Sequence, residues 1–160
     1  MNADETADKV ARAMLASEGT GPAWGIEIEE AREGYARVRM TLRADMLNGH
    51  GIAHGGMIFS LADSAFAYAC NGRNLTTVAA QASIVFLNQA REGEVLVAEC
   101  SEQAIVGRSG VYNVGVRTED GRAIAEFQGL SRSLGGPIIG DLGSKPATGD
   151  GRDRPEKPAG

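Results

Sequence analysis

The sequence predicts an α+β domain in which an antiparallel sheet is wrapped around one long central helix. About sixteen residues ending at Asn71 are mostly Ala, Phe, Leu, Ile and Met, without Pro or an internal Gly. This composition is typical of a helix that is apolar on nearly every side and therefore buried. Five to six further segments have the patterns of strands. Because 160 residues cannot cover such a helix on every face, we expect the chain to self-associate.

The chain begins with a predicted helix over residues 4–17, where apolar residues recur at helical spacing. Asp4 and Glu5 favour its start because the helix dipole stabilises acids there. Residues 19–22 are predicted to end this helix, which makes residues 1–22 an N-terminal helical segment.

The remaining elements are predicted as strands. Residues 24–30 and 34–42 alternate between apolar and polar side chains, which is typical of strands with one wet face. After the central helix, Gly72 is a good stop signal. Four more strands are predicted over residues 76–87, 94–106, 111–118 and 122–134.

The domain is predicted to span residues 23–140. The segment from 135 to 160 holds 7 Gly and 4 Pro, and no apolar periodicity follows Leu142, so residues 141–160 are predicted to be a disordered tail. Residues 1–8 are acidic and polar and carry no secretory signal, which predicts a cytoplasmic protein.

Composition excludes several classes of partner. The formal charge of 16 − 21 = −5 argues against nucleic acid and against anionic membranes. The two cysteines, Cys70 and Cys100, lie in apolar segments and are expected to be buried free thiols. With only two histidines, no metal site is expected.

The start of the central helix has the features of an oxyanion site. The first turn of a helix leaves backbone N–H groups free, and its dipole favours negative charge. His54, Gly55 and Gly56 stand at this point, and the glycines have no side chain to keep a substrate carbonyl away.

Asp63 is a single acid among apolar neighbours, two turns into the helix. At 100° per residue it lies within about 20° of the face that carries Gly56, together with Ser60 and Ala67. Burying a lone carboxylate costs several kcal/mol, so its presence calls for a reason. That reason is either chemistry or a polar contact across a subunit interface.

Together these residues resemble a known signature. Asn48, then His54-Gly55-Gly56, then Leu61-Ala62-Asp63 resembles that of the hotdog-fold acyl-CoA thioesterases, and residues 59–71 are similar to the phenylacetic-acid-degradation (PaaI-type) branch. The similarity extends from about Trp24 to about Pro137. It implies the hotdog fold, homodimers or homotetramers with active sites at the dimer interface, and no cofactor beyond the coenzyme A of an acyl-CoA substrate.

The resemblance also implies roles for individual residues. Gly55, with Gly56 as the second candidate, would donate its N–H to the thioester oxygen, and Asn48 would orient the carbonyl or a water. Asp63 would act as general base or as nucleophile, and His54 would position the loop and the substrate.

The phosphates of coenzyme A need a local cationic site in so acidic a protein. Arg108 and Ser109, in a Gly-flanked turn, match the family's position for such contacts, and Arg73, Arg91 and Arg132 are weaker candidates.

One segment departs from the family's pattern. Some relatives place a second polar or acidic group on the strand after the helix, where this chain has Ala79 and Ala80. Gln81 or Ser83 would replace that group only if their side chains face the site.

Only the resemblance indicates which acyl group the substrate carries. It favours a phenylacetyl or hydroxyphenylacetyl thioester from phenylacetate degradation. Phe59, Phe66, Tyr68 and Phe86 either line an aryl pocket or belong to the core, and a medium-chain acyl group suits the same residues.

Two alternative functions on this fold predict different sequence features. A non-catalytic acyl-CoA sensor on this fold would normally carry a DNA-binding helix pair and lack the carboxylate of Asp63. A hotdog enoyl-CoA hydratase or dehydratase would pair His with an acid in a different order. The motif G-x-S-x-G is absent, which excludes an α/β-hydrolase.

Overall fold

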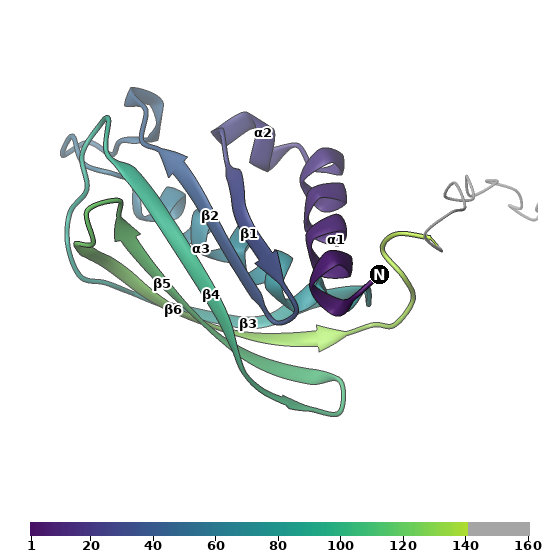
Figure 1. Ribbon diagram of the computed structural model, residues 1–160. Helices are drawn as coiled ribbons and strands as arrows, with labels where there is room; N and C mark the ends of the chain where they lie inside the picture. The colour runs from purple at the N-terminus through teal and green to yellow at the C-terminus, as the bar shows by residue number, and fades with distance from the viewer. Residues whose placement is uncertain (141–160) are drawn as a thin grey trace, which may run out of the picture.

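A computed structural model describes residues 1–140, and its centre is a six-stranded antiparallel sheet with the order β1-β2-β4-β5-β6-β3 (Figure 1). The strands are β1 (Glu27–Arg32), β2 (Tyr35–Thr41), β3 (Thr77–Phe86), β4 (Val95–Val106), β5 (Ser109–Thr118) and β6 (Ala123–Ser133). The helices are α1 (Ala3–Ser17), α2 (Thr20–Trp24), the 3-10 turn η1 (Ala44–Met46) and α3 (Gly55–Asn71). The predicted α+β architecture with one central helix is confirmed.

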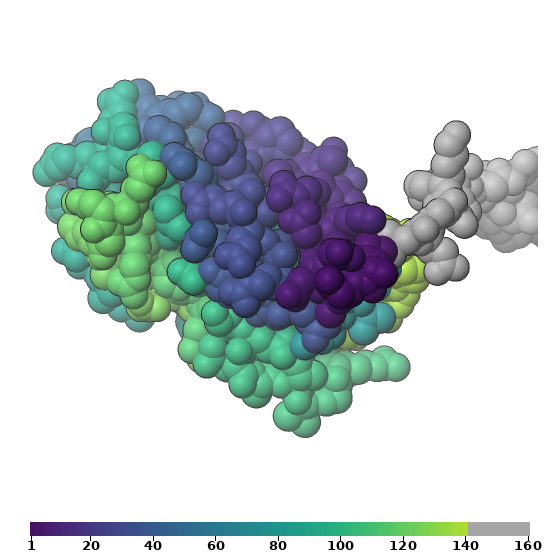
Figure 2. Space-filling view, viewed as in Figure 1, coloured from purple at the N-terminus to yellow at the C-terminus, as the bar shows by residue number. Residues whose placement is uncertain are grey.

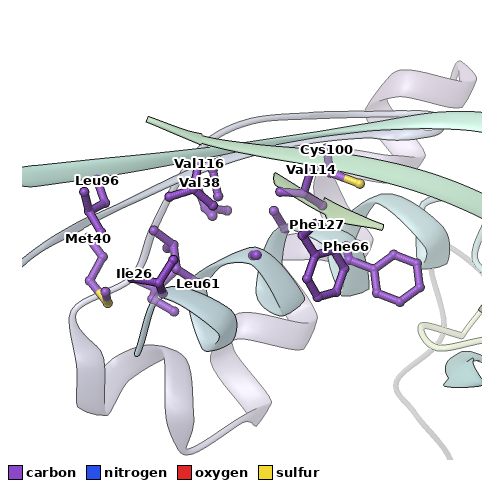
Figure 3. Packing of buried hydrophobic residues seen from close by; sticks show 14 of the residues in the cluster. Ile26, Val38, Met40, Leu61, Phe66, Leu96, Cys100, Val114, Val116 and Phe127 are labelled. Carbon is purple, nitrogen blue, oxygen red and sulfur yellow. The ribbon is translucent and has the colours of Figure 1, made fainter. Parts of the chain in front are cut away.

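The sheet curves around α3, and the core lies between them. Inward side chains from β2, β4 and β5, such as Val38, Leu96 and Val114, are fully buried. They belong to one cluster with Leu61 and Phe66 of α3 (Figure 3). Removing apolar surface of this size from water contributes about 1.5–3 kcal/mol per large side chain, so the helix and the sheet stabilise each other.

Gly129 on β6 allows the aromatic part of this core to close. A Cβ at this position would lie 2.7 Å from two carbons of the Phe66 ring. That ring is 1% exposed and packs 5.5 Å from Tyr112 and 5.9 Å from Phe127, measured between centroids. A side chain at residue 129 would therefore displace a ring that has no free space to move into.

We expect Gly129→Ala to lower the free energy of unfolding by about 1–3 kcal/mol, the usual cost of overpacking a core. The matched control is Gly115→Ala on β5, where a Cβ would meet its nearest atoms at 3.7 Å. The control should stay within about 0.5 kcal/mol of wild type. Urea midpoints measure both changes, and equal midpoints for the two variants would contradict this packing account.

The start of β1 differs from the prediction. Residues 19–22 do not form a plain terminator, because α1 ends at Ser17 and α2 follows at once. Trp24 closes α2 instead of opening a strand, and Gly25, with φ of 65°, caps that helix through N–H contacts to Gly21 and Pro22 carbonyls. The predicted strand over 24–30 is thus shifted to Glu27–Arg32.

Helix α1 lies beside α3 and β1, and its side chains form a continuous surface with those of β1 and β2 (Figure 2). It is opened by a capping box between Asn2 and Glu5, and it buries Ala7, Val10 and Ala11. The Tyr68 hydroxyl of α3 donates to the Glu18 carboxylate at the end of α1. The division of the chain at residue 22 stays a prediction.

One side of α3 is not covered by the sheet. Ser60, Asp63, Ser64 and Ala67 are only half-buried, although the opposite face of the helix is fully enclosed. Next to this open face runs β3, an edge strand of the sheet. The prediction that the chain cannot enclose its central helix holds for this face.

No helix within residues 1–140 is both long and apolar enough to cross a membrane. The predicted disordered tail, residues 141–160, lies outside the described residues.

Candidate active site

The loop before α3 fixes the side chain of Asn48. Its backbone N–H donates to the Ile52 carbonyl at 2.8 Å, and Leu47 and Ala53 form an isolated antiparallel bridge. The Asn48 side-chain oxygen accepts from the backbone N–H of His50 at 2.9 Å. Since the oxygen is held by the loop, the Asn48 NH₂ group is left to donate to a ligand.

His54 is the N-cap of α3, with extended backbone angles of φ −63° and ψ 133°. Its Nδ1 accepts from the N–H of Gly56 at 2.9 Å, which satisfies one of the free donors of the first turn. A nitrogen that accepts a hydrogen bond carries no proton, so the neutral ring has its proton on Nε2. This geometry agrees with a positioning role for His54.

Gly55 and Gly56, the first and second candidates for the oxyanion donor, differ in whether their backbone N–H is free. Within residues 1–140 the Gly55 N–H has no hydrogen-bond acceptor, whereas the Gly56 N–H is already bound to His54. Gly55 and Asn48 both line a pocket of about 350 Å³ at the helix N-terminus. The remaining walls are formed by Ile52, Ala53, Ile58, Phe86, Leu87, Asn88, Gln89 and Ala90. Residues 87–90 could not be predicted as walls of this pocket from the sequence, because they follow β3 and only the fold brings them to the helix start.

Asp63 lies on the open face of α3, and no group among residues 1–140 donates a hydrogen bond to its carboxylate. Partial burial raises the pKa of the Asp63 carboxyl above its ordinary value of 3.8. The cause is desolvation, which disfavours the charged form. Asp63 is eight residues from Gly55, about 12 Å along the helix axis at 1.5 Å per residue.

Turnover should follow the ionisation of Asp63, because a base or a nucleophile must be unprotonated. We expect kcat to fall as the pH is lowered, with a midpoint above the ordinary 3.8 because desolvation raises the pKa. The pH profile of kcat between about pH 3 and pH 8 tests this, since that range includes both the ordinary and a raised carboxyl pKa. A midpoint at or below the ordinary value would contradict the assignment.

Arg108 and Ser109 lie at the other end of α3, in the turn between β4 and β5 that stands out from the body of the sheet (Figure 1). They line a second pocket of about 220 Å³ with Thr77, Ser131 and Ser133. The Arg108 guanidinium forms no ion pair within residues 1–140. The site therefore has one uncommitted cation beside several hydroxyl groups.

The weaker cationic candidates differ in availability. Arg73 is held by two hydrogen bonds to Glu102, at 2.5 and 3.1 Å, and by Glu33 at 3.2 Å. Arg132 contacts the Ser109 hydroxyl at 3.5 Å. Arg73 is thus committed to the protein's own carboxylates, and Arg132 is the better companion of Arg108.

Neither substitute for the family's second polar group faces the site. Ser83 pairs with Gln128 on the outer face of the sheet, and Gln81 shares that face by alternation. A register shift between Ala79 and Gln81 precedes them. The inward positions that follow on this strand are held by Ala82, Ile84 and Phe86, which are all apolar. Asp63 therefore has no polar companion among them.

Known proteins with similar sequences identify the family of this chain. The model of the thioesterase superfamily matches residues 50–125. Acyl-coenzyme A thioesterase PaaI of Escherichia coli K12 is 41% identical over 131 residues, which are 82% of this chain and 94% of that protein. The chain belongs to the thioesterase superfamily.

Solved structures place this thioesterase more closely. The E. coli PaaI protein from the phenylacetic acid degradation operon has a TM-score of 0.83 at 39% identity and covers 85% of this chain and 99% of its own. A hypothetical thioesterase of Streptococcus pneumoniae TIGR4, solved with coenzyme A, has a TM-score of 0.68 at 26% identity and covers 70% and 90%. The predicted hotdog fold and the PaaI-type resemblance are confirmed.

Proposed function

We propose that this thioesterase hydrolyses acyl-CoA thioesters to a free acid and coenzyme A, and that phenylacetyl or hydroxyphenylacetyl thioesters are its preferred class. The observation that carries the proposal is the uncommitted N–H of Gly55 beside the Asn48 amide in a pocket at a helix N-terminus. The relatives named as PaaI support the acyl class.

The pocket suits a thioester carbonyl. As water or a carboxylate attacks, the carbonyl oxygen gains negative charge, and the Gly55 N–H and the dipole of α3 stabilise that charge. The Asn48 NH₂ group orients the carbonyl or the water. The thiolate is a good leaving group, so one carboxylate is sufficient and no acid is needed to protonate the departing atom.

The carboxylate at that carbonyl is Asp63 of the partner subunit. In one chain about 12 Å of helix separates Asp63 from Gly55, whereas a base reaches its proton within about 3 Å or through one water. The open face of α3 and the edge strand β3 offer a surface for a second copy, with Val78 44% and Phe86 52% exposed. A homodimer, single or doubled to a tetramer, brings the donor of one chain to the base of the other.

Arg108 and Ser109 receive the phosphates of the coenzyme A portion. Their pocket combines a cation free of ion pairs within residues 1–140 with the hydroxyl groups of Ser109 and Ser133, which suits phosphate oxygens. The coenzyme A bound to the S. pneumoniae thioesterase supports this class of ligand. No further cofactor is proposed.

The experiment is thiol release from phenylacetyl-CoA, hydroxyphenylacetyl-CoA, benzoyl-CoA and octanoyl-CoA, followed with a thiol-trapping reagent. Release from the arylacetyl thioesters supports the proposal. Binding without thiol release would replace it with an acyl-CoA sensor, and loss of enoyl absorbance from an enoyl-CoA without thiol release would replace it with a hydratase.

The shared site has its own test in mixed subunits. Asp63→Asn and Gly55→Pro chains, each inactive alone, are unfolded together and refolded at equal amounts. Random pairing rebuilds one intact site in half of the dimers, so we expect about a quarter of wild-type activity to return. No return of activity, with mixed dimers present by mass, would place both groups in one chain.

A further inference from the structure

We propose that Phe86 determines the acyl specificity of this enzyme, by contacting the first carbons of the acyl group beside the reacting carbonyl. This inference rests on the proposed thioester hydrolysis. It concerns a side chain at the end of β3, 31 positions after Gly55 in the sequence.

The ring of Phe86 lies directly against the oxyanion donor. A Cβ on Gly55 would be 3.0 Å from Cζ of Phe86 and 3.4 and 3.5 Å from its two Cε atoms. The tip of the ring therefore reaches the backbone whose N–H is proposed to bind the carbonyl oxygen. A carbonyl held by that N–H has its substituents within van der Waals distance of the ring.

Phe86 is also uncommitted to the core, unlike the other aromatic candidates. Phe59 packs edge-on to Phe127 with centroids 5.3 Å apart, and Phe66 is 1% exposed. The Tyr68 hydroxyl is bonded to Glu18. Phe86 remains 52% exposed and is the single aromatic residue that lines the pocket within residues 1–140.

The pocket is small enough for one side chain to change which acyl groups it accepts. Its volume of about 350 Å³ is at the low end for ligand sites, which span about 300–1,000 Å³. Ile52, Ile58 and Leu87 make its other apolar walls. An arylacetyl group carries its ring one carbon from the carbonyl, so that ring reaches Phe86, whereas a straight chain presents only methylene groups there.

Stacking between aromatic rings adds a modest but selective interaction, because offset or edge-on ring pairs are more stabilising than their buried area alone would make them. We expect Phe86→Leu to lower the ratio of kcat/KM for phenylacetyl-CoA over hexanoyl-CoA by about twofold to tenfold. The conservative Phe86→Tyr should keep the ratio of wild type. Both variants are compared at the oligomeric state of wild type, checked by size exclusion.

The matched control is Val85→Ala, which changes the neighbouring residue on the opposite face of the same strand. Val85 pairs with Glu126 on the outer face, so its loss should leave the ratio unchanged. An equal fall for both substrates in Phe86→Leu, or the same change of ratio in Val85→Ala, overturns this inference while thioesterase activity stands. Absence of thiol release by wild type overturns the proposed function instead.

Discussion

Asp63→Asn is expected to reduce turnover at least about a hundredfold, because the amide can neither accept the proton of a water nor attack a carbonyl. The same change should not weaken the fold. Partial burial raises the pKa of the carboxyl, so the charged form is disfavoured in the native state relative to the unfolded chain. The favourable contribution of the protonated Asp63 carboxyl to the free energy of unfolding is present below the unfolded pKa. It is lost as the pH rises through the folded pKa.

At neutral pH, replacing the charged Asp63 with a neutral amide of the same shape should therefore leave the free energy of unfolding equal or higher. Thiol release and urea unfolding of the same preparations measure both effects. Ser64→Ala is the matched control, since its hydroxyl donates to the Ser60 carbonyl within the helix and has no proposed role in the reaction. A variant that loses activity and stability together would show that Asp63 is a structural residue.

Gly55→Pro is expected to reduce kcat by about 10²–10³, the usual cost of one oxyanion donor. Proline removes the backbone N–H and nothing else that the helix needs, because Gly55 is the first residue of α3, where that N–H has no helical partner. The preceding His54 is already extended, with ψ of 133°, as a residue before proline must be.

Gly55→Ala separates the chemical effect from the steric one. Both substitutions add a Cβ about 3.0 Å from the Phe86 ring, which is half-exposed and free to yield, but alanine keeps the N–H. Alanine should retain most of the turnover of wild type. If alanine and proline were equally inactive, crowding against Phe86 and not the lost donor would explain the result.

The order of the helices and strands could be predicted from the sequence because their signals are local. The alternation over residues 34–42 and the apolar run ending at Asn71 each fix an element by their own periodicity. Helix α2 was missed because five residues are too few to show a period. Its end depends on the left-handed backbone of Gly25, which the sequence marks only as a glycine.

The site was predictable in its residue types and not in its arrangement. That Gly55 and not Gly56 keeps a free N–H depends on which way the His54 ring turns, and this is a side-chain rotamer. That Phe86 reaches Gly55 depends on the approach of β3 to α3, which no pattern within either segment encodes. The resemblance already implied an active site at the dimer interface. The rise of about 12 Å between Gly55 and Asp63, compared with the reach of a base, supports the proposal that Asp63 serves the partner's pocket.

In the dimer that we propose, the uncovered face of α3 makes the rate per chain depend on enzyme concentration. The oxyanion donor and the base then come from different chains, so only paired chains turn over substrate. Below the dissociation constant of the pair, the number of pairs falls with the square of the total protein, and so does the initial rate. A newly made chain is then inert towards thioesters until it meets a second one.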